Sequence, residues 1–507
     1  MRQILFLFIL LLSFLGTTSA ANYLTFTAEA DSSAFGISNA GGNGPDVQYS
    51  LDGGKTWKKL TNDTLIPLPK KKKALLRGYN PQGISKADWE TNCFIMTGRI
   101  AASGSVMSLI DGNGEGLVIP GEYCFRGLFK GCTSLTEAPQ LPATTLAMDC
   151  YGEMFSGCTS LTKAPKLPAK TLARDCYEAM FSVCTSLTKA PKLPAQTLAK
   201  GCYEIMFIGC SNLKQAPKLP ATQLAGSCYK KMFNGCKSLT QASELPATTL
   251  HTSCYEKMFS GCTNLTQAPE LPATQLADSC YLEMFASTNI TKAPKLPATT
   301  LAKGCYEGMF NECKSLTQSP ELPAKQLETL CYAAMFKGCE CLTQAPELPA
   351  TQLAIFCYAG MFFECTSLTQ APELPATQLA DGCYFGMFGR CTNLTQAPQL
   401  PATKLANICY RNMFSECTNL TQAPQLPAKE LAAECYTEMF KGCTNLVEIN
   451  VGFTEWREEY ELDGETSSCT RDWLSGVAPT GTFICPKELP KEFGASGIPP
   501  RWKIIEN

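Results

Sequence analysis

The chain has 507 residues, of which 43 are basic and 45 are acidic, giving a net charge of −2. Without a basic excess there is little general attraction for nucleic acid, so nucleic acid is excluded as a predicted partner. A chain of this length exceeds what one compact core can bury, and it is expected to divide into domains or to extend as repeats.

Residues 1–20 have the pattern of a secretory signal peptide. Arg2 precedes an apolar run from Ile4 to Leu15, and a cut is expected after Ala20. The first cysteine after that cut is Cys93, which argues against a lipoprotein anchor. No later apolar run approaches the roughly 18 residues that span a bilayer, so no transmembrane segment is predicted. We expect an exported protein, secreted or at the cell surface, whose mode of retention the sequence does not show.

Residues 21–120 are predicted to form an antiparallel β-sandwich domain. Tyr23–Thr27 alternates between apolar and polar residues, and Ala74–Gly78 is a further candidate strand. Val47–Leu51 and Thr56–Leu60 alternate on either side of Asp52-Gly53-Gly54, which predicts a β-hairpin.

The same hairpin matches a pattern found in sialidases. Ser50–Trp57 fits S-x-D-x-G-x-T-W, the Asp box common in sialidase propellers, so a glycoside hydrolase is one interpretation. A propeller needs several such hairpins at the spacing of its blades, and the sequence contains one. We favour a single hairpin in which Asp52 and the glycines make the turn.

Residues 121–450 are dominated by a 26-residue repeat. One copy, CYGEMFSGCTSLTKAPKLPAKTLARD, begins at Cys150, and a divergent copy begins at Cys124. A unit this short cannot bury its own apolar face and must stack on its neighbours, which predicts a solenoid. Further copies begin at Cys176, Cys202, Cys228, Cys254, Cys280, Cys305, Cys331, Cys357, Cys383, Cys409 and Cys435.

Two elements are expected within each copy. Cys150, Met154 and Cys158 recur at every fourth residue, as do Tyr151 and Phe155, which favours a short helix or 3₁₀ turn. A short parallel strand is predicted near Thr162–Leu167, limited in length because proline donates no ladder hydrogen bond. The predicted fold class is therefore an α+β solenoid, a leucine-rich-repeat-like right-handed stack of short parallel strands and short helical turns.

The segment Met154–Leu161, in which an aromatic precedes C-x-x-L, is followed by Leu167-Pro168. This repeat resembles that of the BspA-like leucine-rich repeat proteins, although its period is longer than the family's commoner form. The resemblance implies an exported repeat protein that acts in adhesion or ligand capture at the cell surface. It implies no particular ligand and no binding residue.

Residues 451–507 break the period and are predicted to form a C-terminal cap. This segment holds Trp456, Trp473 and Trp502, whereas the repeats contain no tryptophan. Aromatic and turn residues of this kind are suited to cover the exposed core of the last copy.

The chain contains 29 cysteines, for which metal ligation, disulfides and burial as thiols are the alternatives. Twelve copies carry a pair such as Cys150 and Cys158, which lacks the close C-x-x-C spacing of zinc sites. The copy at Cys280 keeps its first cysteine and has lost the second, which an obligatory disulfide within the copy would not allow. We predict two ladders of buried thiols, because cysteine behaves as a small apolar residue.

Two columns of variable residues are the candidate ligand surface. The first column is Glu137, Lys163, Lys189, Gln215, Gln241, Gln267, Lys292, Gln318, Gln344, Gln370, Gln396 and Gln422. The second column is Gln140, Lys166, Lys192, Lys218, Glu244, Glu270, Lys295, Glu321, Glu347, Glu373, Gln399 and Gln425. The residues selected as the surface are Lys163, Lys166, Lys189, Lys192, Lys218, Glu244, Glu270, Glu321, Glu347 and Glu373.

Two interpretations of these columns stay open: an extended surface for a large polar ligand, or drift at solvated positions of recently duplicated repeats. The predicted function is that of an exported, non-enzymatic binding or adhesion protein whose partner is an extracellular protein or glycan. The alternative is a passive spacer that displays the N-terminal β domain. With His251 as the single histidine, no catalytic residue, metal site or cofactor is predicted, and the oligomeric state is left open.

Overall fold

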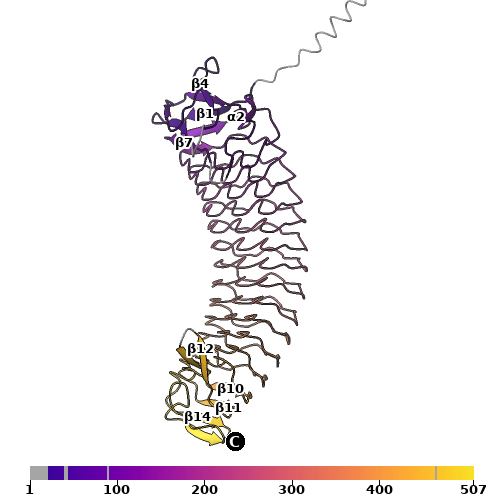
Figure 1. Ribbon diagram of the computed structural model, residues 1–507, viewed down its shortest axis with the longest axis vertical. Coiled ribbons are helices and arrows are strands. Elements are labelled where there is room, and N and C mark those ends of the chain that lie inside the picture. Colours follow the sequence, from indigo (N-terminus) through magenta and orange to yellow (C-terminus); the bar gives the residue numbers. More distant parts are fainter. Residues whose placement is uncertain (1–20, 39–43, 88–90, 463–464) are drawn as a thin grey trace, which may run out of the picture.

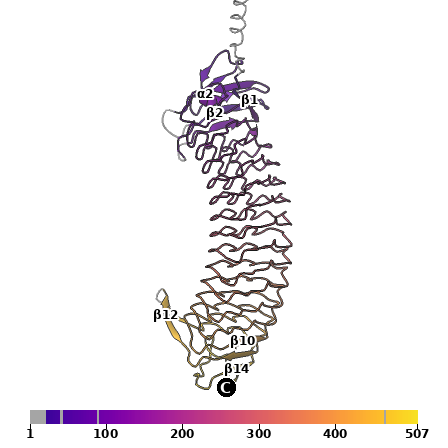
Figure 2. The same ribbon diagram turned by 90° about the vertical axis from the view of Figure 1, so that its right-hand side faces the viewer.

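The structure is a computed structural model that describes residues 21–38, 44–87, 91–462 and 465–507. The chain forms a long, curved stack of coils with a strand-rich region at each end (Figures 1 and 2). The predicted signal peptide, residues 1–20, lies outside the described residues. The solenoid-like arrangement of the repeats that the sequence predicted is confirmed.

The N-terminal region consists of two sheets. One has the strand order β4-β3-β6-β1-β8-β9 and the other β5-β2-β7. Phe26 lies on β1 and packs edge-on against Phe35 of β2 and Phe94 of β7, with ring centroids 5.4 and 5.0 Å apart. The strands are β1 (Leu24–Ala28), β2 (Ala34–Ile37), β3 (Gln48–Ser50), β4 (Lys58–Lys59), β5 (Ile66–Pro67), β6 (Lys73–Arg77), β7 (Phe94–Thr97), β8 (Ile100–Ser103) and β9 (Leu135–Glu137).

The strands expected at the start of the chain are present. β1 and β6 pair antiparallel, and β3 pairs antiparallel with β4, as the hairpin signal at Asp52-Gly53-Gly54 predicted. β8 then pairs in parallel with β9, which belongs to the copy beginning at Cys124. The N-terminal sheet therefore runs directly into the repeats without a linker.

The prediction of a short helix or 3₁₀ turn in each copy is wrong. The single helix in the described part of the chain is α2 (Ser108–Asp111), and Cys150–Cys158 is instead a run of tight turns. The amides of Met154 and Cys158 donate to carbonyls three residues back, whereas those of Tyr151 and Phe155 donate to Cys176 and Met180 of the next copy, at 3.1 and 2.9 Å. Every second amide thus joins adjacent coils.

The four-residue spacing has a different cause from the one expected. Asp149, Glu153 and Gly157 have positive φ values of 51°, 52° and 75°, so the backbone turns once every four residues. An α-helix turns every 3.6 residues, and side chains four apart drift around its axis. A unit of four holds Cys150, Met154 and Cys158 on one face, where all three are fully buried.

The strands predicted near Thr162–Leu167 are absent from the middle of the stack. Residues 138–421 are all described and contain only isolated parallel bridges, such as Gln215 to Gln241. The equivalent segments form β10 (Gln422–Leu426) in the copy that begins at Cys409 and β11 (Glu448–Val451) in the copy that begins at Cys435. Pro165 and its equivalents lack an amide donor, so neighbouring coils do not complete a ladder.

The core is a set of side-chain columns that repeat with the coils. Phenylalanine rings from Phe129 to Phe440 stack at 5.4 to 6.0 Å, with Phe129 to Phe155 at the short end. The tyrosine rings stack beside them, as with Tyr151 and Tyr177 at 5.8 Å. Aromatic rings in parallel offset contact add to the stability that burial alone provides.

The C-terminal region continues the stack beyond the recognisable repeats. Tyr436 and Phe440 donate their amides to the carbonyls of Cys469 and Trp473, at 3.0 and 2.9 Å, so Cys469–Gly476 is a further coil. The sheet order is β10-β11-β14-β15, with every pair parallel. The remaining strands are β11 (Glu448–Val451), β12 (Glu458–Leu462), β13 (Glu465–Ser468), β14 (Thr482–Cys485) and β15 (Lys503–Glu506).

Two tryptophans close this end of the core. Trp473 is fully buried and donates its indole N–H to the carbonyl of Gly497 at 2.9 Å, while Trp502 donates to Ala478 at 2.8 Å. Figure 2 shows the β12–β13 hairpin beside the lower end of the stack. The segment predicted as a cap thus adds one further coil to the stack and covers the end of the core with aromatic side chains.

Candidate functional site

All ten residues of the predicted ligand surface are exposed. None of them forms an ion pair or a side-chain hydrogen bond with another residue in the part of the chain that the structure describes. Parallel bridges join Gln215 to Gln241 and Gln370 to Gln396, so equivalent residues of the first column lie side by side. Alanine and proline lie between the two columns in most copies; Ala164 and Pro165 are half-buried, whereas Ala293 and Pro294 are buried.

The early copies of both columns carry basic residues, and later copies of the second column carry acidic ones. Lys163, Lys166, Lys189, Lys192 and Lys218 lie in the first three copies from Cys150, and Glu321, Glu347 and Glu373 lie in the copies from Cys305 to Cys357. Adjacent like charges on neighbouring coils are mildly unfavourable. The chain therefore presents solvated charge here that its own side chains do not neutralise.

The run of tight turns in each copy, Cys150–Cys158 and its equivalents, is called the turn segment. Charged residues on the turn segments are arranged differently. Arg390 lies between Glu364 and Glu416 at 2.8 and 3.2 Å, so three successive coils alternate in sign. Lys230 is placed in the same way between Glu204 and Glu256, at 3.9 and 3.3 Å. Several charges on the turn segments are thus paired between coils, whereas no such pair occurs among the ten described residues of the candidate surface.

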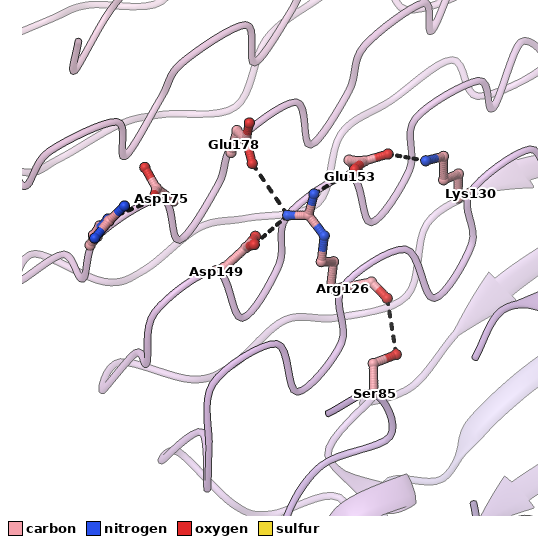
Figure 3. Close-up of polar contacts among 8 residues, drawn as sticks. Ser85, Arg126, Lys130, Asp149, Glu153, Asp175 and Glu178 are labelled. Atoms are coloured by element: carbon pink, nitrogen blue, oxygen red, sulfur yellow. Dashed lines mark hydrogen bonds and ion pairs between the residues drawn. The ribbon is translucent and has the colours of Figure 1, made fainter. Parts of the chain in front are cut away.

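A buried arginine joins the N-terminal region to the first coils (Figure 3). Arg126 is 9% exposed and forms ion pairs with Asp149, with Glu153 at 2.6 Å and with Glu178 at 3.2 Å. These carboxylates come from three successive copies of the repeat, which begin at Cys124, Cys150 and Cys176. Ser85 donates its hydroxyl to the backbone carbonyl of Arg126 at 3.2 Å, which ties the cluster to the N-terminal region.

Protonation within this cluster is perturbed. Burial raises the pKa of Asp149 to about 7, although the hydrogen bond from Arg126 and the charge of its guanidinium oppose that rise. Burial lowers the pKa of Arg126, but the hydrogen bond and charge of Asp149 outweigh this effect and raise it overall. Because the cluster is enclosed between coils, these shifts reflect a structural ion-pair network.

Sequence reasoning missed a hollow of about 510 Å³ on the turn segments of later copies. Its lining includes small residues such as Ala359 and Gly360, and also Phe363, with Lys337 and Arg390 each 5.5 Å from the centroid of that ring. The sequence signal that could have indicated this hollow is the presence of Ala359 and Gly360 where other copies have Glu or Lys, such as Glu256 and Lys257. Arg390 is already paired with glutamates, so the hollow offers less free charge than the two columns.

The carboxylate of the Asp box is fully engaged in hydrogen bonds within its own hairpin turn. The carboxylate of Asp52 accepts hydrogen bonds from the Thr56 hydroxyl at 2.6 Å, the Ser50 hydroxyl at 2.7 Å and two backbone amides at 3.0 Å. These bonds, that of the Thr56 hydroxyl foremost, hold the pKa of Asp52 well below its usual range. Trp57 donates its indole N–H to the carbonyl of Gly54. The arrangement is that of a stabilised hairpin, and His251 lies exposed far along the sequence.

The two cysteine columns of the repeats are buried, as predicted. The second thiol of each pair donates to a phenylalanine carbonyl of the preceding coil, as Cys158 does to Phe129 at 3.1 Å. In the copy at Cys280, Thr288 occupies that place and is 1% exposed. Burial raises the pKa of the Cys150 and Cys210 thiols to about 12, which suppresses the reactive thiolate.

Thiol reactivity of the native protein should follow this burial. Among the 29 cysteines, Cys341 is exposed and Cys93 is half-buried, while the others are buried. We expect iodoacetamide to label Cys341 first and Cys93 more slowly, with the remainder reacting only after denaturation. Mass spectrometry of peptides with and without denaturant measures this. Cysteines that stay unlabelled in denatured, unreduced protein would show disulfides and contradict the thiol ladders.

Two further searches concern metal ions and membranes. Within the described ranges, no group of three or more His, Cys, Asp or Glu side chains is placed to hold a metal ion. Among the same residues, no helix is both long enough and apolar enough to cross a bilayer.

Comparison with known proteins agrees with the repeat pattern. A family model described as the BspA type leucine-rich repeat region, built from six copies, matches residues 121–240, 196–317, 226–369 and 329–458. Together these matches span residues 121–458, about two thirds of the chain. No curated protein and no solved structure matches the chain.

Proposed function

We propose that this chain, which belongs to the BspA type leucine-rich repeat family, is an exported, non-enzymatic binding or adhesion protein. Its partner in this proposal is an extracellular protein or glycan, held along the charged residues of the two columns from Lys163 to Glu373. A stacked scaffold offers a long surface rather than an enclosed pocket, and such surfaces are typical of repeat proteins that bind macromolecules.

One observation carries the proposal. The ten charged residues of the candidate surface are exposed and form no ion pair within the described residues, whereas several charges on the turn segments, such as Lys230 and Arg390, pair between coils. Long, charged stripes of this kind attract partners of opposite charge and raise the rate of encounter. The basic copies would meet an anionic partner, and the acidic copies a cationic one.

Charge reversal of the basic copies tests this function. We expect Lys166→Glu, Lys192→Glu and Lys218→Glu together to weaken binding of an anionic glycan such as heparin by about tenfold or more at low salt, because three favourable contacts become repulsive. Heparin affinity chromatography and calorimetry at two salt concentrations measure the effect. The matched control is Lys170→Glu, Lys200→Glu and Lys237→Glu, which reverses the same charge outside both columns.

A different outcome would favour the alternative of a passive spacer. In that case binding follows the N-terminal region, where Tyr79 is 69% exposed. Because β8 and β9 pair across the boundary, full-length variants are a cleaner test than truncation. If Tyr79→Ser loses heparin binding while the charge-reversed protein keeps it, the stack acts as a spacer and the N-terminal region binds. Turnover of a sialidase substrate would revive the hydrolase interpretation.

A further inference from the structure

The second column carries its like charges in blocks. Lys166, Lys192 and Lys218 occupy three successive copies, and Glu321, Glu347 and Glu373 occupy three others. Stacked rings of neighbouring copies lie 5.4 to 6.1 Å apart, so these charges follow one another closely along the stack. All are exposed and none is paired with a described residue. Like charges repel within each block, and no side chain among the described residues offsets them.

The column is complementary to its own reverse. If a second copy runs antiparallel with Glu270 opposite Glu270, each basic residue meets an acidic one. Lys166 then faces Glu373, Lys192 faces Glu347, Lys218 faces Glu321 and Lys295 faces Glu244. Beyond these pairs, Gln140 faces Gln399, so the charged stretch ends in neutral residues on both sides. The one unfavourable contact is Glu270 with itself.

Neighbouring registers have fewer opposite-charge pairs and more like-charge pairs. A shift of the axis towards the N-terminus by half a copy places Glu244 against Glu270 and Lys218 against Lys295. A half-copy shift the other way places Glu244 against Glu321. Like charges placed opposite one another disfavour a register, so the charge pattern selects a single alignment.

We propose that two copies of this chain associate through the second column as an antiparallel pair with a two-fold axis at Glu270. An isologous contact of this kind uses the same patch on both chains, so every ion pair occurs twice. The inference rests on the proposed binding function and names one partner for it, a second copy. It also places the two N-terminal sheet regions at opposite ends of the pair.

The rest of the face is compatible with this contact. In the same register, Lys163 of the first column faces Gln370 and Lys189 faces Gln344, so no like charges meet there. The half-buried alanines and prolines between the columns are short and rigid. Side chains with few rotatable bonds lose little entropy when a partner covers them.

Sedimentation velocity of the full chain provides the test. Wild type is expected to sediment as a dimer at low salt and to dissociate as salt rises, because the pairs are solvent-exposed and screened. A basic-reversed variant (Lys166→Glu, Lys192→Glu and Lys218→Glu) is expected to associate about 100-fold more weakly. An acidic-reversed variant (Glu321→Lys, Glu347→Lys and Glu373→Lys) should behave in the same way.

Mixing the two variants is the decisive step. In a mixed pair, the reversed residues of one chain face the reversed residues of the other, and the unchanged residues face unchanged ones. A one-to-one mixture is therefore expected to recover the wild-type dimer. Failure of the mixture to associate, or dimers that tolerate both reversals separately, would overturn the proposal.

Two control variants, one single and one triple, sharpen the result. Glu270→Gln removes the like-charge contact on the axis and should tighten the dimer, whereas loss of a true acidic partner would weaken it. The triple variant at Lys170, Lys200 and Lys237 has the same net charge as the basic-reversed one and should dimerise normally. A monomeric wild type that still binds heparin through Lys166, Lys192 and Lys218 would refute self-association and leave the proposed function standing.

Discussion

Replacement of Phe233 by alanine is expected to destabilise the chain by about 3–5 kcal/mol, the usual cost of removing a buried aromatic side chain. Phe233 is fully buried and stacks on Phe207 and Phe259, with ring centroids 5.7 and 5.6 Å apart. Each coil contacts only its neighbours, so the cavity interrupts the stack at that point. Urea unfolding should therefore separate into two transitions, one for each side of the break.

The control for this change is Lys237→Ala, an exposed residue in the next tight turn of the same copy. It is expected to change the free energy of unfolding by no more than about 0.5 kcal/mol. Unfolding of Phe233→Ala in one transition with an unchanged midpoint would contradict a core held together by ring-to-ring contact between coils.

Replacement of Arg126 by methionine is expected to cost about 3–5 kcal/mol, because it leaves buried Asp149 and half-buried Glu153 and Glu178 without their counter-charge. Folded Asp149 has a pKa of about 7, against an ordinary value of 3.8, so it binds its proton more tightly when folded. Its contribution to stability is complete below about pH 4 and declines as pH rises to about 7. In the variant, ionised Asp149, Glu153 and Glu178 repel, so the loss should be greater at pH 8 than at pH 5.

Hydrogen exchange and thermal unfolding at both pH values measure this effect. Exchange should accelerate first in the coils that contain Asp149 and Glu178, while the C-terminal coils keep their protection. Arg174→Met is the matched control, since Arg174 is exposed and its ion pair is with the adjacent Asp175. An equal loss for both variants, or the same loss at both pH values, would argue against the role of the cluster.

The repeated residues were sufficient to predict the stack and its core. The strict recurrence of Cys150, Tyr151, Met154, Phe155 and Cys158 identified the buried columns, because only stacking can cover apolar residues that recur so closely. The strand signals near Tyr23 and Ala74 were also sufficient, since alternation and turn chemistry act locally. The proposed ligand surface stays a prediction, although its residues are exposed.

The turn segment could not be predicted in the same way. Residues with positive φ there include Ala179, Ile205 and Lys231, which have no local preference for that conformation. Hydrogen bonds between coils hold them, and such bonds depend on the neighbouring copy rather than on the residue itself. The coil that begins at Cys469 could not be predicted from the repeat pattern either, because Trp473 and Leu474 replace the usual methionine and phenylalanine.

The shortened copy at Cys280 also shows where the coil can change length. It lacks one residue between Thr288 and Ile290, yet both are buried and the columns continue unbroken through Cys305 and Cys313. The loss falls at a surface bend that follows the second cysteine position, outside the ladder of amides that joins the coils. Foreign loops grafted at the corresponding bends of other copies should therefore be displayed at regular intervals, which would make this stack a ruler-like scaffold for spacing peptides.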